Sequence, residues 1–229
     1  MNERLFFLHS AVITASVLTA CRIGKSALIT LFTVQLIVAN LFVTKQIDLF
    51  GLHVTCTDIY TIGSLMTLNL LQEYHGIRSA EKTVWIALFL LFFFTVMSFF
   101  QLRYLPGPHD TMQHPFVAIL RVTPRLFVAS AFVGLLSRRA DILLYDILKK
   151  RYPTALISRF GLSSLLSQAV DTLLFTYIGL YGSIRSPWQV TLMSYSVKVI
   201  TILGMAPFVT FAKKLIPPSP SRDQDPFRI

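Results

Sequence analysis

Apolar residues fall into seven runs that short polar segments separate. In windows of about 19 residues, the runs lie at 5–21, 26–44, 55–74, 83–101, 114–136, 155–180 and 189–212. A helix needs about 20 predominantly apolar residues to cross a bilayer, and each run approaches or exceeds that length. The pattern therefore predicts an all-α fold, a polytopic transmembrane helical bundle with six or seven spans.

The fourth run is the clearest, and the first two runs are the weakest. The run that includes Trp85 to Phe100 contains no charge and reads as a lipid-facing helix. Only a short basic segment around Gly24 separates the first two runs, which favours a tight helical hairpin. The segment 18–21 ends in Cys21 and resembles a lipoprotein cleavage box, whereas the apolar run that resumes after Lys25 favours a retained first helix.

Composition excludes a soluble domain. The chain has 229 residues, 54% of them hydrophobic, 14% charged, and a mean hydropathy of +0.62, whereas soluble domains carry roughly 25% charged residues. We expect one membrane domain over 1–216 and a disordered cytoplasmic tail, rich in proline, over 217–229. The cations behind the net charge of +10 lie between the apolar runs and not along one face, which argues against a nucleic-acid partner.

The cations are distributed asymmetrically between alternate loops. With the C-terminus inside, the inner segments contain Arg22, Lys25, Arg78, Lys82, Arg138, Arg139, Lys149, Lys150, Arg151, Lys213 and Lys214. The outer segments contain only Arg4, Lys45, Arg103 and Arg185. Cytoplasmic loops are enriched in Lys and Arg, so we expect a multi-pass protein of the cell inner membrane with a cytoplasmic C-terminus.

Motifs for catalysis and for metal binding are missing from the sequence. There is no G-x-S-x-G, H-E-x-x-H or P-loop pattern, so we expect no enzyme activity and no cofactor. Cys21 and Cys56 form no ligand cluster, and the group His109, Asp110 and His114 is a nonspecific pattern beside the turn at 105–108. We therefore expect no metal site.

Polar residues inside the runs are the informative exceptions, because an ionisable group at mid-depth costs about 2.5–3.5 kcal/mol or more. In the third run, Asp58, Asn69 and Glu73 fall on one helix face. The alternative is that Glu73 only caps an interfacial helix end. In the fifth run, Arg125 lies near the centre beside Pro124, which would kink the helix. The alternative is a run that begins later, with Arg125 at the interface.

The sixth and seventh runs contribute Gln168, Asp171 and Lys198. Ser164, Gln168 and Asp171 have helical spacing, and Asp171 and Lys198 fall near their helix centres. The alternative is an Asp171–Lys198 ion pair that only holds two helices together. Polar groups at one level predict a midplane cavity, where secondary transporters bind substrates. The candidate substrate-binding residues are Asn69, Glu73, Arg125, Gln168, Asp171 and Lys198.

The chain resembles the queuosine-precursor transporter family, once filed as vitamin uptake transporters, from about Gly24 to Pro207. The matching segments are Ala39-Asn40-Leu41-Phe42 with Lys45, the stretch 69–76, Pro124-Arg125, Ala129-Ser130, Asp141, Ser163-Ser164, Ser167-Gln168, Asp171-Thr172, and Lys198 before Pro207. Family members often have an acidic residue where Asn69 stands, so a hydrogen-bonding role is expected there.

The resemblance implies import of a 7-deazaguanine (preQ0, preQ1 or queuine) for queuosine modification of tRNA. A guanine-like edge has two adjacent N–H donors and a carbonyl oxygen. Asp171 or Glu73 is expected to accept the N–H groups, and Arg125, Lys198 or Gln168 to donate to the carbonyl. The alternatives are a substrate-capture subunit that needs a separate energising complex, and a non-transporting scaffold. A homo-oligomer is compatible with the sequence.

Overall fold

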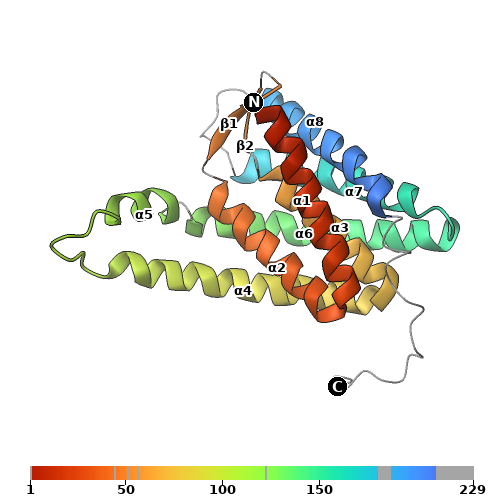
Figure 1. The fold of residues 1–229 in the computed structure, drawn as a ribbon, viewed down its shortest axis with the longest axis horizontal. Coiled ribbons are helices and arrows are strands. Elements are labelled where there is room, and N and C mark those ends of the chain that lie inside the picture. Colours follow the sequence, from red (N-terminus) through yellow and green to blue (C-terminus); the bar gives the residue numbers. More distant parts are fainter. Residues whose placement is uncertain are drawn as a thin grey trace.

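The computed structural model describes residues 2–43, 45–50, 52–55, 57–121, 123–179 and 187–209 and forms an all-α bundle (Figure 1). Its helices are α1 (Asn2–Ile23), α2 (Lys25–Phe42), α3 (Asp58–His75), α4 (Ile77–Arg103), α5 (Gln113–Leu120), α6 (Thr123–Arg151), α7 (Leu156–Leu174) and α8 (Pro187–Met205). A π-helical turn (Phe175–Gly179) continues α7, and a 3-10 turn (Ala206–Phe208) follows α8. The tail predicted at 217–229 lies outside the described residues.

The first two helices form the predicted tight hairpin. Gly24 has a φ of 128°, a backbone conformation that glycine adopts without the steric penalty of a Cβ atom. It is the single residue between α1 and α2. On α1, Cys21 is buried together with Val17. One glycine therefore allows α2 to pack back along α1.

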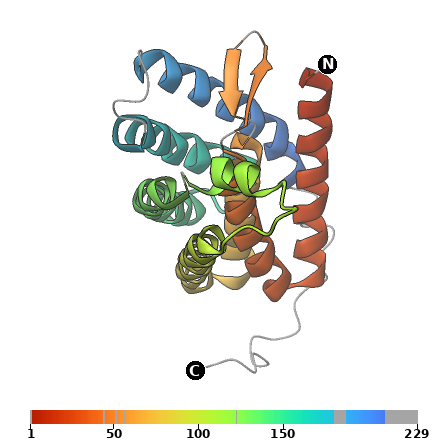
Figure 2. The same ribbon diagram turned by 90° about the vertical axis from the view of Figure 1, so that its left-hand side faces the viewer.

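A β-hairpin that was not predicted joins α2 to α3. Strands β1 (Gln46–Leu49) and β2 (Leu52–Thr55) are antiparallel, with Ile47 opposite Val54. The hairpin lies at the same end of the bundle as the N-terminus of α1 (Figure 2), and the side chain of Asn2 donates a hydrogen bond to the Asp48 carbonyl at 2.8 Å. The hairpin contacts α8 as well, so it covers the end of the bundle where α3 begins.

Helix α3 is the centre of the bundle. It contacts α1, α2, α4, α6, α7 and α8, and residues on every side of it are buried, including Ile62, Leu65 and Leu68. Gly63 allows α1 to come close, because a Cβ atom there would collide with the side chain of Ile13. A helix that is buried all round belongs in a protein core or a membrane bundle.

Helix α4 carries the aromatic face predicted to meet lipid. Trp85, Phe89, Phe92, Phe93 and Phe100 are all exposed, with Phe89 at 66%. Helices α4 and α6 lie side by side along the longest dimension of the molecule (Figure 1). Since exposed aromatic rings at this density are unfavourable in water, this face indicates lipid contact.

The predicted fifth span, 114–136, is divided between two helices, and the break lies beside Pro124, where a kink was predicted. Helix α5 ends at Leu120, and α6 begins at Thr123. Pro124 lies in the first turn of α6, where a missing N–H has no intrahelical partner to lose. Arg125 is thus in the first turn of a 29-residue helix. The side chain of Arg125 lies outside the described residues, so its predicted contact with a carboxylate stays a prediction.

The prediction that residues 138–151 form a loop is wrong. Helix α6 continues without a break to Arg151. Four described helical segments are long and apolar enough to cross a membrane by length and composition: α1, α2, α4 and Thr191–Phe208. Helices α3, α6 and α7 instead carry the polar side chains described below, and the predicted number of six or seven spans stays a prediction.

Candidate functional site

A seam of polar side chains runs between α3, α6, α7 and α8. On α6 and on α7, polar residues recur about every four positions, which places them along one face of each helix. We define the polar seam by these residues together with their partners on α3 and α8; it contains Ser137, Arg138, Asp141, Tyr145 and Lys149 of α6, Arg159, Ser163, Ser164, Ser167, Gln168, Asp171 and Thr172 of α7, Asp58, Asn69 and Glu73 of α3, and Lys198 of α8. A four-residue step rises about 6 Å, so the seam divides into three layers.

The Lys198 layer consists of a cation between two carboxylates. The Nζ atom of Lys198 lies 2.9 Å from Oδ2 of Asp171 and 3.9 Å from Oδ1 of Asp58. It also donates to the hydroxyl of Thr172 at 3.0 Å. The hydroxyl of Ser137 donates to the other oxygen of Asp171 at 2.9 Å. The Lys198 side chain is only 6% exposed, so this layer is an almost fully buried ion-pair network.

The Asp141 layer lies about one turn after the Lys198 layer on α6 and about one turn before it on α7. Asp141 is completely buried and accepts a hydrogen bond from Ser167 through Oδ1, at 3.2 Å. The side chains of Ser163 and Asn69 lie beside the same carboxyl group. The amide of Asn69 donates to the hydroxyl of Ser164 at 3.4 Å. This layer therefore joins α3, α6 and α7 through short neutral side chains around one carboxylate.

The Glu73 layer closes the seam at the C-terminal end of α3. Arg159 lies 3.1 Å from Oε1 of Glu73, and Lys149 lies 3.2 Å from Oε2. The Tyr145 hydroxyl donates to the same Oε2 at 3.1 Å. The side chain of Arg159 is 1% exposed. Glu73 is thus the acceptor of a second ion-pair network, separate from the Lys198 layer.

Several buried polar atoms along the seam have no hydrogen-bond partner among the described residues. The acceptors are Oδ1 of Asn69, Oδ2 of Asp141 and Oε1 of Gln168, and the donors are Nε of Arg138 and Nε and Nη1 of Arg159. Buried polar groups in native proteins are nearly always paired. Unpaired donors and acceptors along the seam, most of the acceptors in the Asp141 layer, indicate a place where a polar ligand completes the hydrogen bonds.

The structure brings most of the predicted site residues to the seam, but not to one level. Asp171 and Lys198 pair directly, and Asn69 lies in the next layer. Glu73 is fifteen residues beyond Asp58 on α3, roughly 22 Å along the helix axis, and its partners are different. The prediction of one midplane cluster that includes Glu73 is therefore wrong. Gln168 is 2% exposed and lies next to Ser167 on α7.

Sequence reasoning missed the contribution of α6. The family resemblance includes Asp141, and the predicted loop at 138–151 covers Arg138, Tyr145 and Lys149. The guanidinium of Arg138 lies over the ring of Phe32, 5.7 Å from its centroid, and interacts electrostatically with Asp171 and Asp141. The spacing of Ser137, Asp141, Tyr145 and Lys149 was the available signal, because steps of four mark one helix face.

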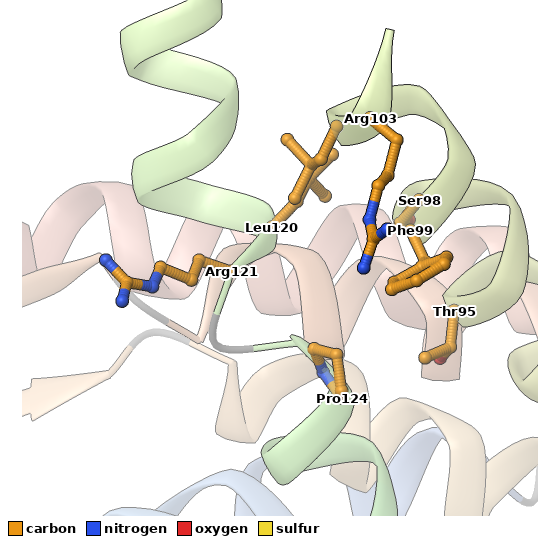
Figure 3. A pocket seen from close by; sticks show the side chains of 8 residues that line it. Thr95, Ser98, Phe99, Arg103, Leu120, Arg121 and Pro124 are labelled. Atoms are coloured by element: carbon orange, nitrogen blue, oxygen red, sulfur yellow. The ribbon is translucent and has the colours of Figure 1, made fainter.

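A separate pocket of about 380 Å³ lies between α4, α5 and the start of α6 (Figure 3). Arg103 extends into it and lies over the ring of Phe99, 4.5 Å from the centroid, whereas Arg121 points away from the other lining side chains. The residues that line it are Thr95, Ser98, Phe99, Leu102, Arg103, Leu120, Arg121 and Pro124. None of them is a carboxylate or an amide, so this pocket does not offer the acceptors that the seam offers.

Lipid-facing helices around a buried, charged and partly unpaired seam define a class of protein. Ionisable groups inside a membrane bundle mark substrate or ion pathways, and a membrane transporter is the class that this arrangement defines. The chain belongs to the family described as "Putative vitamin uptake transporter", which it matches over residues 56–212. That match includes α3, α6, α7 and α8, and with them the whole polar seam.

A curated relative extends the comparison beyond the family match. The chain is 28% identical over 200 residues to a protein of Bacillus subtilis (strain 168) named "Probable queuosine precursor transporter", and the aligned part covers 85% of this chain and 86% of the relative. No solved structure matches the chain. The predicted family resemblance is therefore confirmed, and the chain is a membrane protein of the transporter class.

Proposed function

We propose that this protein imports a queuosine precursor of the 7-deazaguanine type across the cell inner membrane and releases it unchanged. The observation that supports this most directly is the set of unpaired acceptors and donors in the buried seam. The name of the Bacillus subtilis relative supports the same substrate class. The substrate is a flat heterocycle with several N–H donors and a carbonyl oxygen, and both kinds of group find partners along the seam.

The ring faces of such a substrate need apolar walls. Two buried aromatic rings lie against cations of the seam: Phe32 beside Arg138, and Tyr145 beside Arg159, whose guanidinium is 5.5 Å from the ring centroid. Both rings are 0% exposed. Offset stacking on an aromatic ring stabilises a flat heterocycle without restricting which edge groups it carries.

The seam is closed in this conformation. Asn69 is 1% exposed, Asp141 0% and Gln168 2%. The Lys198 and Glu73 layers lie on either side of the Asp141 layer and link the helices by ion pairs. With the C-terminus in the cytoplasm, the Lys198 layer faces the outer side and the Glu73 layer the inner side. Import then requires the two ion-pair networks to open in turn, as in alternating access.

The decisive experiment is uptake by the purified chain in liposomes that contain no other protein. Radiolabelled preQ1 should accumulate up to its external concentration or beyond, and unlabelled preQ0 or queuine should compete. Arg159→Leu should abolish uptake, whereas Lys150→Met, which changes an exposed lysine, should not. Uptake that needs an added ATPase complex would identify a substrate-capture subunit, and liposomes without uptake and without ligand-induced thermal stabilisation would refute the proposal.

A further inference from the structure

Apart from Asp58, whose Oδ1 lies 3.9 Å from Lys198, the carboxylates of the seam differ in how many acceptor positions remain open. Both oxygens of Asp171 accept bonds, from Lys198 and Ser137. Both oxygens of Glu73 are also engaged, by Arg159 on one side and by Tyr145 and Lys149 on the other. The two carboxylates that the sequence favoured for substrate recognition are thus already occupied by the protein.

Asp141 is different because one of its oxygens is open. Its Oδ1 accepts from Ser167, but Oδ2 has no hydrogen-bond partner among the described residues, and the residue is 0% exposed. Leaving a buried carboxyl oxygen unpaired costs free energy. A carboxylate in this state is completed by a ligand that brings its own N–H donors.

The side chains of Ser163, Ser167 and Asn69 lie beside the Asp141 carboxyl group, yet the unpaired acceptors around it outnumber the unpaired donors. Oδ1 of Asn69 and Oε1 of Gln168 are unpaired acceptors on the two helices that face it. The nearest unpaired donor of α6 is Nε of Arg138, one turn before Asp141. The layer therefore has a surplus of acceptors beside a single cation, which matches a ligand edge with two or three N–H groups and one carbonyl oxygen.

We propose that Asp141 is the specificity-determining carboxylate of the transporter, and that it accepts the ring N–H and the exocyclic amine of a 2-amino-4-oxo-deazapurine. The inference rests on the proposed function. A carboxylate accepts two parallel N–H donors in a bidentate geometry. A ligand without the exocyclic amine leaves one acceptor of this buried site unpaired, and such a site rejects it strongly.

The test is a binding comparison between 7-deazaguanine and 7-deazahypoxanthine, which lacks only the exocyclic amine, on purified full-length protein in detergent. The wild type should prefer 7-deazaguanine by about 10- to 100-fold, as expected for a hydrogen bond to a charged group. Asp141→Asn replaces one acceptor with a donor, so the preference of this variant for 7-deazaguanine over 7-deazahypoxanthine should fall below about threefold. Asp146→Asn on the same helix, whose carboxylate pairs with the exposed Lys150, should keep the full preference.

A second variant makes the test independent of how well Asp141→Asn folds. Asp141→Glu keeps the charge but moves the carboxylate by about one bond length, so the preference should fall while a carboxylate remains. A wild-type preference that survives in both variants would overturn the assignment of Asp141, and so would a preference lost in Asp171→Asn but retained in Asp141→Asn. Wild-type protein that binds neither compound, nor preQ1, would instead overturn the proposed function itself.

Discussion

Replacing Lys198 with methionine removes the cation that pairs with two buried carboxylates. Nζ lies 2.9 Å from Asp171 and 3.9 Å from Asp58, and the lysine side chain is 6% exposed. Methionine fills a similar volume but removes the cation that both carboxylates share, and Asp171 then has Arg138 as its remaining cation. Removing one partner of a buried ion pair destabilises a protein by about 3–5 kcal/mol. In a chain of this size, 1 kcal/mol shifts the melting temperature by about 2–4 °C, so we expect a decrease of about 6–20 °C.

Thermal unfolding in detergent, followed by the loss of monodisperse protein, measures this shift. The control is Lys150→Met, because Lys150 pairs with Asp146 at 2.7 Å but is 77% exposed. An exposed pair contributes about 0–1 kcal/mol, so the control should melt within about 4 °C of the wild type. The double variant Asp171→Asn with Lys198→Met should recover part of the loss, since only Asp58 then stays unpaired. Equal melting temperatures for Lys198→Met and the control would refute the reasoning that this pair is desolvated.

Three further predictions test other parts of the structure. Glu73→Gln should lower the melting temperature by a similar amount, because its arginine partner is 1% exposed; a change below 3 °C would contradict the buried network. Gly63→Ala should cost about 1–3 kcal/mol, since a Cβ there collides with α1, whereas Gly161→Ala, with open space around it, should be neutral or stabilising by up to about 1 kcal/mol; the reverse order in thermal unfolding would contradict the packing. A cysteine at Thr111, which is exposed between α4 and α5, should react in intact cells with a membrane-impermeant maleimide in a cysteine-free background; labelling only after lysis would invert the topology.

The helices were largely predictable because lipid requires long apolar segments. The runs at 5–21, 26–44, 55–74, 155–180 and 189–212 correspond to α1, α2, α3, α7 with its π turn, and α8. The hairpin at Gly24 followed from the short distance between two runs and from the freedom of glycine at positive φ. The polar face of α3 was also predictable, since Asp58 and Asn69 both point to partners on α7 and α8.

The break before α6 and the length of α6 were not predictable from hydropathy. An average over about 19 residues does not resolve the short interval between Leu120 and Thr123, so α5 and the first turns of α6 merge into one run; only the kink predicted at Pro124 indicates the break. Arg138 and Arg139 then read as loop cations, although one lies over Phe32 inside the bundle and the other over Trp85. A helix whose polar face packs on other helices has a low mean hydropathy and resembles a loop in such an average.

The composition of the site was predictable, but the pairing within it was not. Helical spacing identifies which residues share a face, but it does not tell which neighbour that face meets or at what depth. Glu73 was therefore grouped with Asp171, whereas the structure pairs it with Arg159. Asp141 could be recognised as exceptional only from the structure. Whether one of its oxygens lacks a donor depends on which side chains α3 and α7 place beside α6.

The charges of the polar seam balance, and this has an electrical consequence. Its acidic members are Asp58, Glu73, Asp141 and Asp171, and its basic members are Arg138, Lys149, Arg159 and Lys198. Moving one elementary charge across the membrane potential changes the free energy by about 2.3 kcal/mol per 100 mV, but opposite charges that move together cancel. A helix movement that carries the whole seam together therefore moves no net charge. Only the separation of ion pairs as each network opens is subject to the potential, and in the proposed function a neutral substrate such as preQ0 adds no charge to that step.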